Sequence, residues 1–190
     1  TRFSSMKELP SCFKAYDIRG RVPEDLSPAL ARSVGQAYVG EIRPSGPVVV
    51  GRDMRLESPD ITAALIQGLT EAGANVIDIG ECGTEEVYFQ TFHRAAGGGV
   101  MITASHNPKG FNGMKLVREG ARPISGDSGL RAIGIRAQGL LDSGLSEVHG
   151  TKNGQISEDL DKRDYIDHLL GYVDGDKLSP LRIVANAGNG

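Results

Sequence analysis

One segment of the sequence, residues 103–115, concentrates side chains that could carry out group transfer. Ser105 lies just beyond a short apolar run, where open α/β folds place their ligands, and a serine there can act as a nucleophile or carry a phosphoryl group. Residues that bend or stiffen a chain favour a tight loop around this serine: Pro108, Gly110 and Gly113. Two neighbours offer hydrogen bonds to a ligand: His106 and Asn107.

Lys115 could place a positive charge beside Ser105. It follows Ser105 by ten positions, on a segment that we expect to return past the loop as a strand. A polar Ser-Asn-Pro turn followed by an exposed lysine explains the same residues equally well. The chemistry of this segment therefore leaves both interpretations open.

A second polar group lies in residues 16–20, Tyr-Asp-Ile-Arg-Gly. The guanidinium of Arg19 would suit a bidentate contact with a phosphate, although alone the segment is better explained by an Asp17–Arg19 ion pair at a turn. Arg52 and Asp53 follow an apolar run at the same expected edge of a sheet. Together these segments place polar residues along one rim, as an active-site edge requires.

Several other patterns indicate no site. Residues 126–129, Gly-Asp-Ser-Gly, are similar to the nucleophile segment of trypsin-like proteases, but they lack a β-barrel context and the G-x-S-x-G spacing, so we expect Ser128 to be a helix N-cap. No G-x-G-x-x-G follows the first strand and no phosphate-binding P-loop exists, which disfavours nucleotide binding. Three histidines lack metal-ligand spacing: His93, His149 and His168.

Short apolar runs bounded by glycine or proline predict strands that are buried on both faces. They cover residues 48–50, 76–79 and 100–103, and an earlier strand is expected over 13–18. The run at 114–117 follows Thr103 too closely for a crossover helix. It should therefore pair antiparallel to the strand before it.

Amphipathic segments between these runs predict helices. Ser27-Pro28 and Ser58-Pro59 each suggest a serine N-cap with proline in the first turn. The first helix would bury Leu30, Val34, Ala37 and Tyr38, and the second Ile61, Leu65, Ile66 and Leu69 before stopping at Gly73. A third would begin at Thr84 and bury Val87, Phe89 and Phe92, and a fourth would cover 130–141. The alternation predicts an α/β fold with a doubly wound mixed sheet, mostly parallel with one antiparallel strand.

The chain length of 190 residues suits one domain and part of a second. We expect residues 1–12 to be an N-terminal extension, 13–145 the first domain, and 146–190 a linker and the start of a second α/β domain. The polar stretch 143–159 is typical of a linker. After it, a helix over 161–173 would turn Tyr165, Ile166, Leu169 and Leu170 inward, and 181–185 would form a strand.

Composition excludes several classes of protein. Hydrophobic residues make up 39% and charged residues 24% of the chain, which argues against disorder throughout. A net charge of −3 argues against broad nucleic-acid binding. No run approaches the ~18 apolar residues of a membrane span, so no membrane partner is expected. Cys12 and Cys82 lie too far apart to suggest a disulfide framework, which favours reduced thiols and a cytoplasmic location.

Three segments, in this order, resemble the α-D-phosphohexomutase family: residues 13–20 (Phe-Lys-Ala-Tyr-Asp-Ile-Arg-Gly), 51–53 (Gly-Arg-Asp) and 103–108 (Thr-Ala-Ser-His-Asn-Pro). Three more are similar to its bacterial phosphomannomutase branch, which includes bifunctional phosphomannomutase/phosphoglucomutases: 83–89, 113–119 and 121–125. The likeness covers nearly all of residues 13–190. Each motif alone is moderately specific, whereas the ordered combination is highly specific.

The resemblance implies a phosphoserine enzyme that interconverts mannose 1-phosphate and mannose 6-phosphate, as in GDP-mannose biosynthesis. Ser105 would donate its phosphoryl group to a hexose phosphate, and the resulting hexose 1,6-bisphosphate, also the activator, would return its other phosphate. Arg19 and Lys115 would supply positive charge and assist proton transfer. The hexose phosphate pocket would be shaped by Tyr16, His106 and Asn107.

The resemblance also implies a Mg²⁺ ion that bridges the phosphate on Ser105. Its other ligands would be aspartates of a D-G-D-G-D-R loop that this sequence lacks. Asp174 and Asp176 are superficially similar, but they precede the expected 181–185 strand, whereas the family loop lies beyond a full second-domain unit. Without that loop and the distal phosphate clamp, this chain would resemble an N-terminal fragment that is inactive alone.

Three alternative functions stay open at this point. The same chemistry could serve a phosphoglucomutase or a phosphoglucosamine mutase, because the loops that discriminate the sugars are absent. A non-catalytic module that binds sugar phosphates could keep the fold, although the presence of both Ser105 and Lys115 argues against it. A serine hydrolase using Ser105 would lack both the nucleophile elbow and evident His and Asp partners. The oligomeric state is not predicted by the sequence.

Overall fold

The computed structural model describes residues 9–144, 152–186 and 188, and it divides into two compact units, Thr1–Leu160 and Asp161–Gly190. Predictions for residues 1–8, for 145–151 including His149, and for 187, 189 and 190 lie outside the described residues. The described part contains no helix with the length and apolar character needed to cross a membrane.

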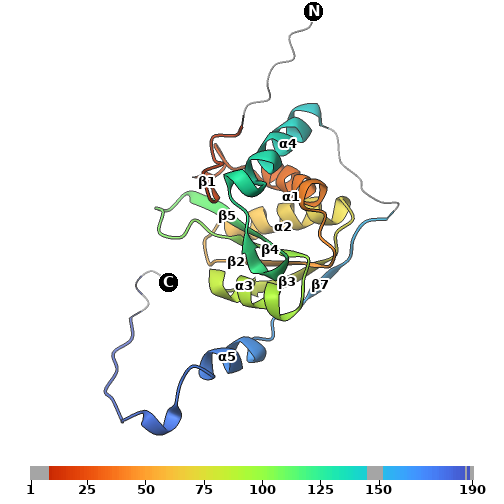
Figure 1. The fold of residues 1–190 in the computed structure, drawn as a ribbon. Coiled ribbons are helices and arrows are strands. Elements are labelled where there is room, and N and C mark those ends of the chain that lie inside the picture. Colours follow the sequence, from red (N-terminus) through yellow and green to blue (C-terminus); the bar gives the residue numbers. More distant parts are fainter. Residues whose placement is uncertain (1–8, 145–151, 187, 189–190) are drawn as a thin grey trace, which may run out of the picture. The chain divides into compact units, whose positions relative to one another are not determined.

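The first unit is built on a sheet with the strand order β1-β5-β4-β2-β3-β7, and a short strand β6 pairs with β5 (Figure 1). The strands are β1 (Ile18–Arg21), β2 (Val48–Arg52), β3 (Val76–Glu81), β4 (Gly98–Ile102), β5 (Phe111–Arg118), β6 (Arg122–Pro123) and β7 (Ile156–Glu158). The pairs β2–β3, β2–β4 and β3–β7 are parallel, whereas every antiparallel pair includes β5. The prediction of a mostly parallel sheet with one antiparallel strand is thus confirmed.

Helices cover both faces of this sheet, as the doubly wound prediction requires. Helices α1, α2 and α4 lie on one face and α3 lies on the other (Figure 1). Their bounds are α1 (Pro28–Ile42), α2 (Ser58–Glu71), α3 (Thr84–His93) and α4 (Leu130–Ser143), with short 3₁₀ helices η1 (Glu119–Ala121) and η2 (Gly126–Ser128). Ser27 caps α1 as predicted, since its Oγ accepts a hydrogen bond from the Leu30 amide at 3.1 Å.

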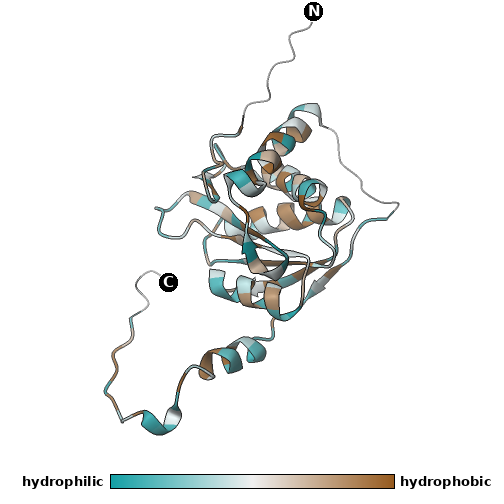
Figure 2. Cartoon of the chain, viewed as in Figure 1, coloured by the Kyte–Doolittle hydropathy of each residue, from teal (hydrophilic) through white to brown (hydrophobic). Residues whose placement is uncertain are grey.

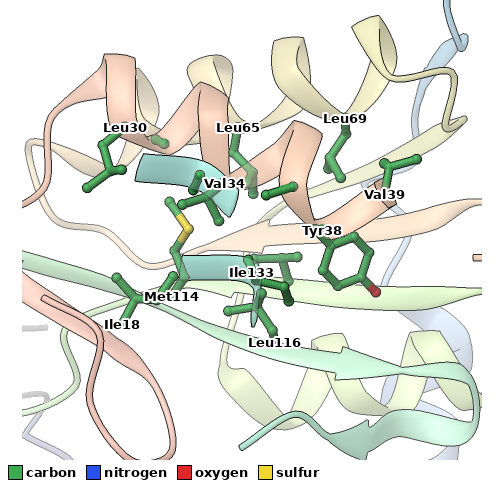
Figure 3. Close-up of a cluster of buried hydrophobic side chains, with 14 of the residues drawn as sticks. Ile18, Leu30, Val34, Tyr38, Val39, Leu65, Leu69, Met114, Leu116 and Ile133 are labelled. Atoms are coloured by element: carbon green, nitrogen blue, oxygen red, sulfur yellow. The ribbon is translucent and has the colours of Figure 1, made fainter. Parts of the chain in front are cut away.

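The main core lies between the sheet and helices α1, α2 and α4. Hydrophobic colour is concentrated on α1, α2 and the strands (Figure 2), and the apolar residues predicted to line α1 and α2 are all buried. Figure 3 shows Tyr38 among these side chains, where its hydroxyl donates a hydrogen bond of 2.8 Å to the Val117 carbonyl. A smaller cluster on the other face joins Val49 and Met101 to Val87 of α3.

Helices α1 and α2 pack so closely that their backbones nearly touch. A Cβ added to Gly68 of α2 would lie 1.9 Å from the Arg32 carbonyl oxygen of α1, and one added to Gly35 would lie 2.5 Å from the Leu65 carbonyl oxygen. No side chain can occupy either position without a shift of the neighbouring helix. The two glycines therefore set the distance between the helices that cover the sheet.

Three local predictions for the first unit are wrong. The first strand runs over Ile18–Arg21 rather than 13–18, because β5 supplies pairing partners only from Ile18 onward, apart from an isolated Phe13–Ile18 bridge. Phe92 is 71% exposed, because it lies on the outer side of α3. The N-cap of α2 is Glu57 rather than Ser58, whose hydroxyl is used by Asp53 and Asn112 instead.

Two further predictions, for Ser128 and for the 143–159 linker, differ from the structure. Ser128 does not cap α4, whose N-cap is Gly129; instead it forms a capping box with Ser125 around η2. Within the expected 143–159 linker, residues 156–158 form β7, which extends the sheet beside β3. The first compact unit includes β7 and runs to Leu160.

The second unit contains helix α5 (Arg163–Leu170) and the short 3₁₀ helix η3 (Gly175–Lys177). Ile166, Leu169 and Leu170 were expected to turn inward but are exposed, because the described residues of this unit form no second layer for the helix to cover. Residues 181–185 were expected to form a strand and do not. A single extended segment has no ladder partner here, and pairing is what makes a strand.

We expect Gly68→Ala to lower the free energy of unfolding of the first unit by about 1–3 kcal/mol, the cost of overpacking. Alanine gains roughly 1 kcal/mol over glycine in helix propensity, but the clash with the Arg32 carbonyl is with rigid backbone and should dominate. Urea denaturation of the variant measures the change. Ala63→Ser, on the exposed side of the same helix, should stay within about 0.5 kcal/mol, and a stabilised Gly68→Ala would contradict the close approach.

We expect the two thiols to differ in reactivity. Cys12 is 1% exposed, and burial raises its pKa to about 11, so only about 0.1% is thiolate at pH 8. Cys82 is half-buried. Iodoacetamide at pH 8 should alkylate Cys82 first and Cys12 only after unfolding, as followed by peptide mass spectrometry. Equal labelling of both cysteines in the folded chain would show that the core around Cys12 is open.

A candidate active site at the carboxyl edge of the sheet

Four polar segments meet at one edge of the sheet, where the parallel strands end. Arg19 of β1 pairs with Gly113 of β5, and the Thr103 amide donates a 3.0 Å hydrogen bond to the Gly113 carbonyl. The Asp53 amide, just past β2, donates a 2.9 Å bond to the Ile102 carbonyl. The residues predicted to form a rim therefore lie in one row across four strands.

Gly113 allows β1, β5 and the end of β4 to lie close together in this row. A Cβ at this position would lie 2.1 Å from the Ile18 carbonyl oxygen and 2.9 Å from the Thr103 carbonyl oxygen. Both oxygens belong to backbone that cannot move independently of the sheet. Glycine is therefore required where β1, β5 and the end of β4 approach each other.

Ser105 sits on the loop that follows β4, two residues beyond Thr103. Its side chain is exposed and its backbone has φ +54°, a left-handed conformation that costs a non-glycine residue about 1–3 kcal/mol. The Thr103 Oγ1 accepts a 2.9 Å hydrogen bond from the Ser105 amide and helps to hold this conformation. A serine with a strained backbone and an exposed hydroxyl, at the end of a buried strand, is suited to group transfer.

Asp17 gathers the two cations that the sequence placed at the site. Its Oδ2 lies 2.5 Å from an Arg19 Nη and 3.6 Å from the Lys115 Nζ. The Asp17 side chain is 11% exposed, compared with 39% for Arg19 and 32% for Lys115, so the carboxylate is covered while both cations reach solvent. Two positive charges are thereby presented together, and the single carboxylate neutralises only one of them.

These charges lie on the face of the sheet that α3 covers. Strand neighbours point to opposite faces, and Ile18, Met114 and Leu116 belong to the core on the other face. Tyr88 of α3 is close enough to Asp17 to be affected by its charge: burial, together with the charges of Glu85 and Asp17, raises the pKa of Tyr88.

The other predicted site residues are placed less tightly. Tyr16 is 81% exposed, so little of its ring packs against the described residues. His106 is exposed and Asn107 is half-buried, both on the Ser105 loop. The structure thus brings Arg19 and Lys115 together through Asp17, and it carries Ser105, His106 and Asn107 on one loop beside them.

A buried polar network was missed by the sequence reasoning. Asn112 Nδ2 donates to Ser58 Oγ at 2.9 Å, and Ser58 Oγ donates to Asp53 Oδ1 at 2.6 Å. The Asp53 Oδ2 in turn lies 3.4 Å from the Nε of Arg55. A polar Asn112 two positions before the predicted 114–117 strand and an Arg two positions after Asp53 were the available signals.

The described residues contain no group of three or more His, Cys, Asp or Glu side chains that could hold a metal ion. Asp174 accepts a hydrogen bond from the Asp176 amide and pairs with Lys177 at 2.8 Å. These acids serve the local turn at η3. A complete Mg²⁺ site therefore does not fit the residues described in this chain.

Comparison with known proteins agrees with this geometry. Residues 10–137 match the family model "Phosphoglucomutase/phosphomannomutase, alpha/beta/alpha domain I". Similar proteins include "Phosphohexose mutases" of Xanthomonas campestris pv. campestris strain B100, 55% identical over 96% of this chain, and "Phosphomannomutase" of Escherichia coli K12, 50% identical over 97%. The chain spans 39% and 40% of the lengths of these two relatives.

A solved structure of a phosphoglucomutase/phosphomannomutase family protein from Burkholderia thailandensis is also similar. It aligns with a TM-score of 0.72 and 31% identity, covering 85% of this chain and 36% of that one. A putative phosphomannomutase from Thermus thermophilus aligns with a TM-score of 0.69 and 26% identity, covering 87% and 36%. The fold and sequence comparisons thus agree.

We expect Asp17→Asn to lower the free energy of unfolding by about 1–2 kcal/mol, because it leaves Arg19 and Lys115 without their shared counter-charge. The loss should be smaller in 1 M NaCl than in 0.05 M NaCl, since salt screens the repulsion between the two cations. Urea titrations at both salt concentrations measure this. Asp127→Asn, at an exposed aspartate in η2, serves as the control, and an equal, salt-independent loss in both variants would contradict the pairing.

Proposed function

This chain belongs to the phosphoglucomutase/phosphomannomutase family, and on that basis we propose that it is the phosphoserine-bearing part of a phosphohexomutase. The substrates would be mannose 1-phosphate and mannose 6-phosphate. The observation that supports this most strongly is the strained Ser105 loop beside the Asp17–Arg19–Lys115 group. The names of the similar proteins support a mutase acting on hexose phosphates.

The proposed reaction has two phosphoryl transfers. In the first, O6 of mannose 1-phosphate attacks the phosphorus on Ser105, the P–Oγ bond breaks, and mannose 1,6-bisphosphate forms. After the intermediate reorients, Oγ of Ser105 attacks the phosphorus on O1, and mannose 6-phosphate leaves. The O6 proton is released in the first transfer and one is returned to O1 in the second, so enzyme and protons are both regenerated.

Arg19 and Lys115 would balance the negative charge of the phosphate. Phosphoryl transfer needs positioning and cationic screening more than covalent chemistry. The guanidinium can contact two phosphate oxygens at once, and the ammonium can act as a point charge that also donates a proton, which the resulting amine can later take back. Arg19 or Lys115 would then exchange Asp17 for the phosphate as its partner, while Tyr16, His106 and Asn107 would contact the sugar.

We further propose that Mg²⁺ contributes to catalysis in the longer protein by screening the phosphate on Ser105. Within the described part of the chain, that phosphate would be the group that binds the ion, because the described residues do not form a carboxylate cluster. The remaining ligands would have to come from outside the described residues. The roles of Ser105, Arg19 and Lys115 given above do not depend on the ion.

Glucose phosphates are a second candidate substrate pair. The Xanthomonas relative is named for phosphohexoses in general, and the Burkholderia structure belongs to a family named for both sugars. Phosphoryl transfer at Ser105 would be identical for either sugar. Initial rates with mannose 1-phosphate and with glucose 1-phosphate distinguish a mannose-specific enzyme from a bifunctional one.

In a protein that joins this chain to the remaining family domains, Ser105→Ala should reduce mutase activity by at least about 10³-fold, because it removes the phosphoryl carrier. Ser128→Ala removes only a hydroxyl of the η2 capping box, costs about 0.5–2 kcal/mol of stability and should leave the rate near wild type. A coupled assay from mannose 1-phosphate to mannose 6-phosphate measures both variants.

Phosphopeptide mass spectrometry of the same proteins is the independent readout. Wild type incubated with mannose 1,6-bisphosphate should carry phosphate on Ser105, and Ser105→Ala should carry none in that peptide. Near-normal activity of Ser105→Ala, or phosphate found only on other serines, would refute the proposal.

A further inference from the structure

Arg55 holds the Ser105 loop through hydrogen bonds to the backbone carbonyl groups of the loop. Its two Nη atoms donate to four carbonyl oxygens of the loop: Ser105 at 3.0 Å, Asn107 at 2.5 Å, Pro108 at 3.0 Å and Phe111 at 3.1 Å. The side chain is only 18% exposed. A guanidinium presents its donors in a rigid planar fork, so one residue can fix carbonyls from both ends of the loop.

Ser105 itself is held from both sides by side chains. Its amide donates to Thr103 Oγ1 at 2.9 Å, and its carbonyl accepts from Arg55 at 3.0 Å. These two bonds bracket the residue whose φ is +54°. A strained conformation persists only where its surroundings over-determine it, and here Thr103 and Arg55 do so.

Arg55 is in turn oriented by residues at the end of β2 and at the start of β5. Asp53 lies 3.4 Å from its Nε and accepts its backbone amide at 3.1 Å. Asp53 is fixed by Ser58, which is fixed by Asn112 of β5, and both Ser58 and Asn112 are completely buried. Because Asn112 directly follows the last carbonyl bound by Arg55, at Phe111, the network closes on the loop that it supports.

The carbonyl arrangement also matters for charge. A phosphoserine carries about −1.5 to −2 charges at neutral pH, which nearby carbonyl oxygens would repel. Arg55 draws four carbonyl oxygens of the loop onto one positive group. Their negative ends are therefore neutralised before any phosphate is present, and no reorganisation is needed when it arrives.

We infer that Arg55 is a positioning residue for phosphoryl transfer: with Thr103 it fixes the Ser105 backbone and neutralises the loop carbonyls, without contacting the substrate. The inference rests on the proposed function of Ser105. Lysine keeps the charge of Arg55 but lacks the planar fork of donors with which arginine spans four carbonyls. A misplacement of about 1 Å can slow a reaction by about 10²-fold, so Arg55→Lys should slow phosphorylation of Ser105 by roughly that factor.

The test uses a protein that contains this chain and the remaining family domains. Dephosphorylated enzyme is mixed with mannose 1,6-bisphosphate, and phosphate on Ser105 is followed by rapid quench and peptide mass spectrometry. Arg55→Lys should show the roughly 10²-fold slower rate, whereas the Kd of the bisphosphate should stay within about threefold of wild type, because Arg55 faces the loop and not the ligand. Arg94→Lys is the matched control: Arg94 is also partly buried, and its side chain donates hydrogen bonds to Gln90 of α3 and to Asp159, which directly follows β7.

A second pair of variants covers the case in which Arg55→Lys does not fold. Thr103→Val removes the acceptor of the Ser105 amide and should slow phosphorylation, whereas Thr103→Ser keeps that hydroxyl and should preserve the rate. Rates near wild type for Arg55→Lys and Thr103→Val, or an equal loss in Arg94→Lys, would overturn the inference. Wild-type protein that never carries phosphate on Ser105 would instead refute the proposed function, and the inference with it.

Discussion

The return of β5 between β1 and β4 is the constraint on which the site depends. It pairs antiparallel with β1, β4 and β6, and its register places Gly113 between Arg19 and the end of β4. The same strand carries Lys115 opposite Met101 and presents Asn112 to the buried Ser58. A shift of one residue would turn Lys115 into the core and Met114 toward the charges, so the core on one face fixes the chemistry on the other.

Two charged groups lie at this edge, Asp17 with its two cations and Asp53 with Arg55, and they serve different purposes. Asp17 balances Arg19 and Lys115 incompletely, and both cations remain open to solvent. The charge of Arg55 is covered and taken up by Asp53 and four loop carbonyls. One arrangement therefore leaves positive charge available for a ligand, whereas the other uses positive charge to hold backbone. The first can exchange partners because both of its cations reach solvent, whereas the second is covered.

How much the sequence could predict follows from how local each signal is. Strand and helix segments, the antiparallel β5 and the Ser27 cap depend on periodicity and neighbouring residues, and these were predicted. The Ser58 hydroxyl bonds Asp53, which is five positions away, and Asn112, which is 54 positions away, so it was assigned to the nearest helix end instead. Strand β7 was missed because three exposed residues in a polar stretch carry no strand signal until β3 pairs with them. Arg55 was missed for a similar reason: its partners are backbone carbonyls, which have no signature in sequence.

A rigid loop and an exposed hydroxyl are compatible because different atoms of Ser105 serve the two purposes. Its amide donates a hydrogen bond to Thr103 and its carbonyl accepts one from Arg55, whereas its side chain is exposed to solvent. The free energy needed to order the loop and to keep φ at +54° is thus supplied when the domain folds, mainly by buried hydrogen bonds that extend to Asn112. A group arriving at the Ser105 Oγ would meet a backbone that is already fixed. Preorganisation of this kind lowers the reorganisation cost of a charged reaction, which is why the buried network belongs to the site as much as the serine does.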